Sequence, residues 1–228
     1  MNALDRPVWA SLATHHAPLS EGGTLARRFV RDVHLFASAC DDTVPAQAAL
    51  AGLVHPGEQV FVLQAAQIAV PPGLDALKRA QGVQMVAARD LRAHAPDDAL
   101  VVLTDADAPE MLALALLTEP GPFLARTHTM GRFLGVRIDG RLAAMAGERL
   151  RFPGGTEVSG VCTHPDFRGR GLARRLSAAV AAAIQARGEI AFLHAWKMNH
   201  AAIALYETLG FEHRTDVNVA VLARHPPR

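Results

Sequence analysis

The stretch of this sequence that most clearly indicates chemistry is a turn rich in glycine and arginine, Arg168-Gly169-Arg170-Gly171. Glycines let the backbone turn tightly and aim several N–H groups at one point. A helix is predicted directly after the turn, because apolar residues recur there at helical spacing. These residues are Leu172, Leu176, Val180 and Ile184. Since the N-terminus of a helix carries a partial positive charge, the turn is predicted to bind a phosphate or diphosphate.

Two common phosphate-binding motifs do not match this turn. A P-loop needs GxxxxGK followed by Ser or Thr, with the lysine for the terminal phosphates. A dinucleotide fingerprint needs G-x-G-x-x-G. Gly169 and Gly171 supply only its first half, and Arg174 stands where the third glycine would be. Arginine at a helix N-terminus is unfavourable for the helix dipole, so a bound anion would explain Arg168, Arg170 and Arg174 together.

A second group of residues with telling spacing lies near the C-terminus. Asn199 is followed by Tyr206 and then by Leu209-Gly210-Phe211. The separation of Asn199 and Tyr206 is about two helical turns, so the two residues share one helix face. Asn199 can also cap that helix, and Tyr206 is the only tyrosine in the chain.

Both groups resemble motifs of the GCN5-related N-acetyltransferases. The acyl-CoA-binding motif of that family is Gln or Arg, two residues, Gly, one residue, then Gly or Ala, and Arg168, Gly171 and Ala173 occupy its fixed positions. Asn199, Tyr206 and the Leu-Gly-Phe that follows match a later segment of the family in type and spacing. The sequence is most similar to the branch of FR47-like and glycine N-acyltransferase-like C-terminal domains. The resemblance covers about residues 99–224 and says much less about the first part.

The resemblance implies an α/β fold in which helices cover both faces of a mixed, mostly antiparallel sheet. It implies an N-acetyltransferase that moves an acetyl or other acyl group from acetyl-CoA to a primary amine by direct attack in a ternary complex. The acceptor would be a small molecule or amino acid, and a peptide N-terminus stays open. Two other functions also stay open: a non-catalytic module that binds or senses acyl-CoA, and a phosphate-binding domain without acyl chemistry.

Acyl transfer to an amine needs a proton acceptor, a proton donor and groups that hold the carbonyl oxygen. Glu157 is the candidate base, because histone-acetylating members of the family carry a Glu at the same separation from the position of Arg168. The other interpretation of Glu157 is a solvated strand residue or a partner of a nearby arginine. Glu148 and His164 are the reserve candidates. Tyr206 is the candidate general acid for the departing thiolate, with aromatic packing as its alternative.

The resemblance also implies where acetyl-CoA would be held. Backbone N–H groups from Val161 to Thr163 would bind the carbonyl oxygen and the pantetheine arm where the strand splays, and an isolated Gly160 predicts a bulge there. The turn would bind the diphosphate and the 3′-phosphate. The predicted cofactor-binding residues are Val161, Cys162, Thr163, Arg168, Gly169, Arg170, Gly171, Leu172, Ala173, Arg174 and Asn199. Cys162 has no basic neighbour at a telling spacing, so a buried packing role is favoured over a nucleophile.

Composition sets the remaining bounds. With 228 residues, half of them hydrophobic, the chain can hold one large or two modest domains. A net charge of +1 lacks the basic surplus of a general nucleic-acid or membrane-surface binder. Cys40 and Cys162 are the only cysteines, and the eleven histidines show no metal-binding spacing. With no signal-peptide core and no apolar run of membrane-spanning length, we expect a cytoplasmic protein without a metal. Oligomeric state is not indicated.

Two segments are expected along the chain. Residues 1–97 would form an N-terminal α/β region and residues 98–228 the catalytic domain, joined by a proline-broken linker at 93–98. The N-terminal region is either a degenerate copy of the same fold or an extension that covers one edge of the catalytic sheet.

The expected elements follow from apolar patterning and turn residues. In the N-terminal region we predict strands at 32–39, 59–63 and 84–87, and helices at 45–54 and 74–81. In the catalytic domain the predicted order is β-α-β-β-β-α-β-α-β. Its strongest local signal is a hairpin turn at Asp139-Gly140, because Asp-Gly between apolar strands favours that turn.

Overall fold

An eight-stranded sheet, in the order β4-β11-β5-β10-β9-β8-β7-β6, forms the frame of the molecule. The structure is a computed structural model that describes residues 2–93 and 98–224. The strands are β4 (Gln59–Gln64), β5 (Asp75–Ala87), β6 (Leu100–Leu103), β7 (Phe133–Ile138), β8 (Arg141–Phe152), β9 (Gly155–Thr163), β10 (Ile190–Trp196) and β11 (Phe211–Ala223). Neighbouring strands are antiparallel except β9 and β10, which are parallel. The predicted mixed, mostly antiparallel sheet is confirmed.

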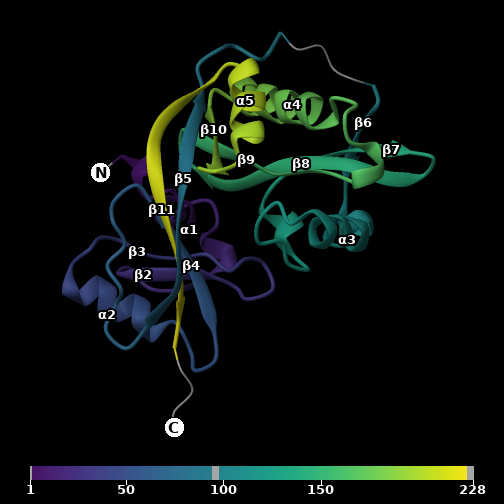
Figure 1. The fold of residues 1–228 in the computed structure, drawn as a ribbon. Coiled ribbons are helices and arrows are strands. Elements are labelled where there is room, and N and C mark those ends of the chain that lie inside the picture. Colours follow the sequence, from purple (N-terminus) through teal and green to yellow (C-terminus); the bar gives the residue numbers. More distant parts are fainter. Residues whose placement is uncertain (1, 94–97, 225–228) are drawn as a thin grey trace.

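Helices cover both faces of this sheet, as Figure 1 shows. They are α1 (Pro7–Leu12), α2 (Val44–Gly52), α3 (Ala108–Thr118), α4 (Leu172–Ala186) and α5 (His200–Thr208). α4 and α5 lie on one face, and α3 lies on the other. The predicted apolar stripe of α4, from Leu172 to Ile184, is buried against the sheet. None of the helices in the described residues is long and apolar enough to cross a membrane.

The C-terminal part follows the predicted order of elements. From β6 through α3, β7, β8, β9, α4, β10 and α5 to β11, it reads β-α-β-β-β-α-β-α-β. The turn between β7 and β8 has positive φ at both Asp139 and Gly140, as a tight hairpin turn requires.

The N-terminal part contributes strands to the same sheet. β5 pairs with β11 along its whole length and with β10 through its second half, and β4 pairs with the other side of β11. The sheet is therefore continuous between the two predicted segments. Residues 94–97 of the predicted linker lie outside the described residues. A separate three-stranded sheet, β1 (Ser20–Gly22), β2 (Ala26–Phe29) and β3 (Ala37–Ala39), packs with α2 beside β4.

Two N-terminal predictions were wrong in type or length. The helix predicted at 74–81 is the first half of β5, and the strand predicted at 32–39 is reduced to Ala37–Ala39. Residues 74–81 include good helix formers such as Leu77 and Lys78, so local propensity favoured a helix. Pairing with β11 overrides that propensity. The helix predicted at 45–54 and the strand at 59–63 are confirmed as α2 and β4.

Candidate active site

The site lies where the two parallel strands of the sheet separate. β9 and β10 pair only from Gly155 to Glu157 and from Ile190 to Phe192, and they diverge beyond that point. Gly160 of β9 has φ +62, and the pairing of β9 with β8 shifts register beside it. The predicted bulge is therefore confirmed. A cleft of about 590 Å³ lies at this splayed region and is lined by residues of both strands.

One half of the cleft is built by the glycine- and arginine-rich turn and the start of α4. Gly169 and Gly171 have φ of 76 and 72, and the space that a Cβ would occupy at either position is open. The first N–H groups of a helix lack intrahelical acceptors, and the first hydrogen bond at this end runs from the Arg175 N–H to the Gly171 carbonyl oxygen. The remaining free N–H groups, together with the exposed Arg168 and Arg170, fit a diphosphate.

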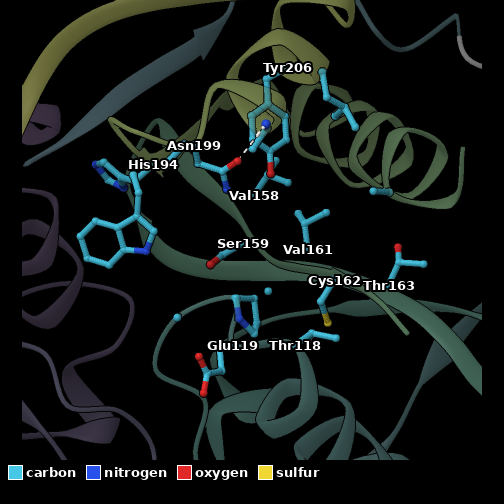
Figure 2. A pocket seen from close by; sticks show the side chains of 18 of the residues that line it. Thr118, Glu119, Val158, Ser159, Val161, Cys162, Thr163, His194, Asn199 and Tyr206 are labelled. Atoms are coloured by element: carbon cyan, nitrogen blue, oxygen red, sulfur yellow. Dashed lines mark hydrogen bonds between the residues drawn. The ribbon is translucent and has the colours of Figure 1, made fainter. Parts of the chain in front are cut away.

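The structure brings the predicted cofactor residues to this one cleft. Its lining includes Val161, Cys162, Thr163, Arg168, Gly169, Arg170, Gly171, Leu172, Ala173, Arg174, Asn199 and Tyr206. Figure 2 shows that Val161, Cys162 and Thr163 follow one another along β9, below the helix that carries Tyr206. We call this part of the cleft, residues 161–163 and 167–174 with Asn199 and Tyr206, the cofactor half.

Asn199 begins α5 and Tyr206 lies within it, as the spacing predicts. The Asn199 side chain caps the helix, because its Oδ1 accepts a hydrogen bond from the Ala202 N–H at 3.1 Å. The ring of Tyr206 packs edge-on against Phe211, and its hydroxyl points into the cleft in Figure 2. Burial, followed by the charge of Glu157, raises the pKa of Tyr206 to about 12. The hydroxyl therefore stays protonated at neutral pH and can donate a hydrogen bond into the cleft.

Cys162 is a poor nucleophile in this environment. Its side chain is buried, and burial raises the pKa of the thiol to about 11. The thiolate is the reactive form of cysteine, so a buried thiol at neutral pH favours the predicted packing role. Cys162 and Cys40 are both free of disulfides.

Glu157, the predicted base, lies behind the cleft wall and is completely buried. Arg149 donates to both of its carboxylate oxygens, from Nε at 2.8 Å and from Nη2 at 2.6 Å. The Nδ1 atom of His194 lies 2.7 Å from Oε1. Burial alone would raise the pKa of Glu157, but the charge and hydrogen bonds of Arg149 and His194 outweigh it and hold the pKa well below its usual range.

This geometry does not fit direct proton abstraction by Glu157. Its oxygens are occupied by strong donors, and a carboxylate with a lowered pKa is a weak base. The contacts of Glu157 match its alternative interpretation, which is a partner for a nearby arginine. Arg149 and His194, rather than Glu157, line the cleft.

His194 is held in one tautomer by the N-terminal part of the chain. The Gln84 amide nitrogen lies 2.8 Å from the Leu4 carbonyl oxygen and 3.0 Å from Nε2 of His194, while its Oε1 accepts from Arg214 at 2.8 Å. An amide NH₂ only donates, so Nε2 of His194 accepts. The proton of the neutral ring is thus assigned to Nδ1, which faces Glu157.

The two reserve candidates for the base lie elsewhere. Glu148 is buried and accepts a hydrogen bond from Arg187 at 2.9 Å, near the C-terminal end of α4. His164 accepts from the Asp166 N–H at 3.2 Å and lies 3.1 Å from Arg141. Neither side chain lines the cleft, so neither prediction fits the geometry. Within the described ranges, no cluster of His, Cys, Asp and Glu side chains is arranged to hold a metal ion.

None of the residues that line the other half of the cleft was among the predicted site residues. Its lining comes from the N-terminal region, from the loop after α3, and from β8, β9, β10 and β11; we call it the acceptor half. Its residues include Phe36, Phe61, Leu63, Thr118, Glu119, Pro120, Gly121, Pro122, Arg149, Ser159, His194, Trp196, Val217 and Val219. Only Arg149 had a usable signal, because a β8–β9 hairpin brings it near the oppositely charged Glu157.

The N-terminal region is tied to the loop that bounds the acceptor half. The Thr127 hydroxyl donates to the Val33 carbonyl oxygen at 2.6 Å, and Arg126 forms an ion pair with Asp32 at 3.3 Å. The guanidinium of Arg149 stacks over the ring of Phe36 at 5.0 Å. These contacts fix the aromatic wall of the cleft against the catalytic part of the sheet.

Comparison with known proteins places this fold in a family. Residues 133–220 match the family model of the FR47-like protein. A structure from Novosphingobium aromaticivorans, assigned to the GNAT family of acetyltransferases, is 42% identical with a TM-score of 0.92 and covers 99% of this chain and 100% of its own.

More distant structures share the fold alone. A GCN5-related N-acetyltransferase from Kribbella flavida is 18% identical, with a TM-score of 0.65 and coverage of 100% of this chain and 97% of its own. A Drosophila protein is 20% identical, with a TM-score of 0.59 and coverage of 84% and 70%. No curated protein matches the sequence. At 42% identity over the whole length of the first structure, this chain belongs to the GNAT family of acetyltransferases.

Proposed function

We propose that this protein is an N-acetyltransferase that moves the acetyl group of acetyl-CoA to a primary amine by direct attack in a ternary complex. One observation supports the proposal: a single cleft joins the glycine- and arginine-rich turn, a splayed strand and a buried tyrosine hydroxyl, and continues into the acceptor half. A site for a phosphate alone would need neither the tyrosine hydroxyl nor the acceptor half.

The cofactor half would hold acetyl-CoA through main-chain groups and arginines. The N–H groups of the Arg168–Ala173 turn would bind the diphosphate, and Arg168, Arg170 and Arg174 would supply positive charge for the phosphates. The strand end from Val161 to Thr163 would pair with the pantetheine arm and hold the thioester carbonyl oxygen as it gains charge. Asn199 caps α5 and would contact the same arm.

The transfer itself would use Tyr206. The amine nitrogen forms a bond to the thioester carbon, the carbon–sulfur bond breaks, and the sulfur leaves with the bonding electrons. The Tyr206 hydroxyl would give its proton to that sulfur. Water in the cleft would take the proton that the amine loses and would return a proton to the Tyr206 oxygen. Glu157 would not take it, because its carboxylate is occupied by Arg149 and His194. In this proposal Glu157 holds those two side chains in place.

The acceptor would be a small molecule or amino acid with a primary amine, and a peptide N-terminus stays open. A cytoplasmic location belongs to the same proposal, because the free thiols of Cys40 and Cys162 suit a reducing compartment.

A CoA-release assay over a panel of amines tests this function, with Tyr206→Phe as the control for the chemical step. We expect acetyl-CoA, but neither ATP nor NAD, to raise the melting temperature, and at least one amine to release CoA. Stabilisation by acetyl-CoA without acylation of any amine would favour the non-catalytic sensor instead. Equal stabilisation by ATP would favour a general phosphate-binding domain.

A further inference from the structure

The acceptor half contains one charged group, the carboxylate of Glu119, that makes no contact stabilising the fold among the described residues. Among the cleft-lining residues that the structure describes, Glu119 contributes the one carboxylate. It is exposed, and no hydrogen bond or ion pair to its side chain occurs within residues 2–93 and 98–224. Figure 2 shows Glu119 and Thr118 on the wall that faces Tyr206 across the cleft.

Glu119 occupies a position that disfavours its own side chain. It is the C-cap of α3 with φ 48 and ψ 53, and its N–H donates to the Ala115 carbonyl oxygen. Glycine is preferred in this left-handed conformation, and a carboxylate at a helix C-terminus opposes the helix dipole. Asp139, the other non-glycine residue with positive φ in the described part, is explained by its hairpin turn. The end of α3 explains the conformation of Glu119, but it does not explain why a glutamate stands there, and an unfavourable residue at a cleft is grounds for a functional hypothesis.

The surroundings of Glu119 define what it would meet. Pro120 and Pro122 stiffen the loop after it, and the guanidinium of Arg149 reaches this loop at Gly121. The same guanidinium stacks on Phe36, so Glu119 and the aromatic wall border one part of the cleft. That wall is apolar: Phe36, Phe61, Leu63, Val217 and Val219 line it.

The charges in the acceptor half favour an acceptor substrate that carries a positive charge and no carboxylate. A primary amine has a pKa near ~10 and arrives as an ammonium ion at neutral pH. Arg149 already forms a two-fold ion pair with Glu157, so its charge is neutralised before a substrate carboxylate could use it. Glu119 has no such partner among the described residues.

We propose that Glu119 binds the ammonium group of the acceptor, and that the acceptor is a primary amine on an apolar body that packs against Phe36, Phe61 and Leu63. This inference rests on the proposed N-acetyltransferase function and names its substrate class. Glu119 is a specificity-determining residue in this account, because it holds the amine before transfer.

The test compares Glu119→Gln with Glu119→Asp, using phenylethylamine as acceptor. Glu21→Gln is the matched control, since Glu21 is an exposed glutamate on β1, away from the cleft. Loss of a charged hydrogen bond should raise the KM for phenylethylamine at least about tenfold in Glu119→Gln. The kcat and the KM for acetyl-CoA should change little, Glu119→Asp should recover part of the loss, and Glu21→Gln should match the wild type. Neutral phenylethanol should inhibit the wild type and Glu119→Gln equally.

Two results would overturn the inference. One is an unchanged KM for phenylethylamine in Glu119→Gln; the other is a clear preference for phenylalanine, whose added carboxylate would then be bound by Arg149. Calorimetric titration of phenylethylamine into the CoA-saturated protein separates this inference from the proposed function. Binding that depends on Glu119 without acetyl transfer would sink the function alone, and transfer that is indifferent to Glu119 would sink the inference alone. Neither binding nor transfer of phenylethylamine would also count against the inference.

Discussion

The two halves of the cleft are built on different principles. The cofactor half is made largely of main chain: a turn with two left-handed glycines, the start of α4 and the bulged end of β9. The acceptor half is made of side chains that arrive from the N-terminal region, the loop after α3 and four strands of the sheet. Main-chain contacts recognise a constant ligand whatever the neighbouring side chains are. We therefore expect cofactor binding to depend on backbone conformation and acceptor choice to depend on side chains.

The two halves also differ in how they are held. Apart from Asn199 and Tyr206, the cofactor half comes from one continuous segment, residues 160–174, whereas the acceptor half is supported by a buried polar network. This network runs from Arg149 through Glu157 and His194 to Gln84 and Arg214. Because it crosses β8, β9, β10, β5 and β11, damage to it should loosen the sheet as well as the acceptor half.

The largest expected effect is on stability, from Glu157→Gln. Removing one partner of a buried ion pair leaves the other uncompensated and costs about 3–5 kcal/mol. Urea denaturation should show a loss of this size, while the exposed control Glu21→Gln should lie within about 0.5 kcal/mol of the wild type. Full stability together with loss of the acidic limb of the pH–activity profile would instead restore Glu157 as a base.

The wild type and Glu157→Gln should also differ in how their stability depends on pH. The pKa of Glu157 is lowered in the folded state from an ordinary value of 4.5, so its stabilising contribution is present above that value and is lost as pH falls through the folded pKa. The difference in unfolding free energy between the wild type and Glu157→Gln should be constant above about pH 4.5 and should shrink in more acidic solution. A difference that grows on acidification would contradict the ion pair.

Tyr206→Phe tests the chemistry of the cofactor half. General acid catalysis contributes typically 10²–10⁴-fold, so kcat should fall by about 10² or more, with little change in acetyl-CoA affinity. Because the ring is buried against Phe211, Phe should preserve packing, and the melting temperature should stay close to that of the wild type. An undiminished kcat would remove Tyr206 from the mechanism.

The titration of the same residue sharpens that test. Tyr206 is the only tyrosine, so tyrosinate absorbance reports on it without interference. We expect the absorbance to appear near pH 12 rather than near 10. The Tyr206→Phe variant provides the baseline, and a transition at the ordinary pKa would mean that the hydroxyl is not buried as described.

The smallest expected effect compares two glycines at opposite ends of α4. Gly171 and Gly188 have φ of 72 and 76, and a Cβ would meet open space at either. Alanine in this conformation costs roughly 1–2 kcal/mol, so Gly171→Ala and Gly188→Ala should lose similar stability. Only Gly171→Ala should also weaken acetyl-CoA binding. A loss of about 1.4 kcal/mol in binding free energy would raise the Kd about tenfold. Equal acetyl-CoA affinity in both variants would argue against main-chain recognition.

How far the sequence predicted these features depends on the range of the interactions involved. The turn at 168–171, α4 and the Asn199 cap depend on neighbouring residues, and all were predicted. The strand β5 was partly mistaken for a helix, because its partner β11 lies more than a hundred residues away in sequence. Glu157 was assigned a role from its separation from Arg168. The contacts that remove it from the cleft come from Arg149 and His194, and the tertiary pairing with His194 leaves no trace in local spacing.

The individual residues of the acceptor half could not be predicted, for the same physical reason. Phe36 and Phe61 line the same cleft as Glu119 only because the N-terminal region shares the sheet and is bonded to residues 126–127. Nothing in the composition of residues 1–97 signals that placement. The positive φ of Glu119 is likewise a property of how α3 ends.

A crystal structure with bound acetyl-CoA tests the central claim most directly. The account predicts the diphosphate on the N–H groups of the Arg168–Ala173 turn, the thioester carbonyl beside the bulge at Gly160, and the sulfur within hydrogen-bonding reach of the Tyr206 hydroxyl. A diphosphate bound away from that turn, or a thioester that points away from both Tyr206 and the acceptor half, would contradict it.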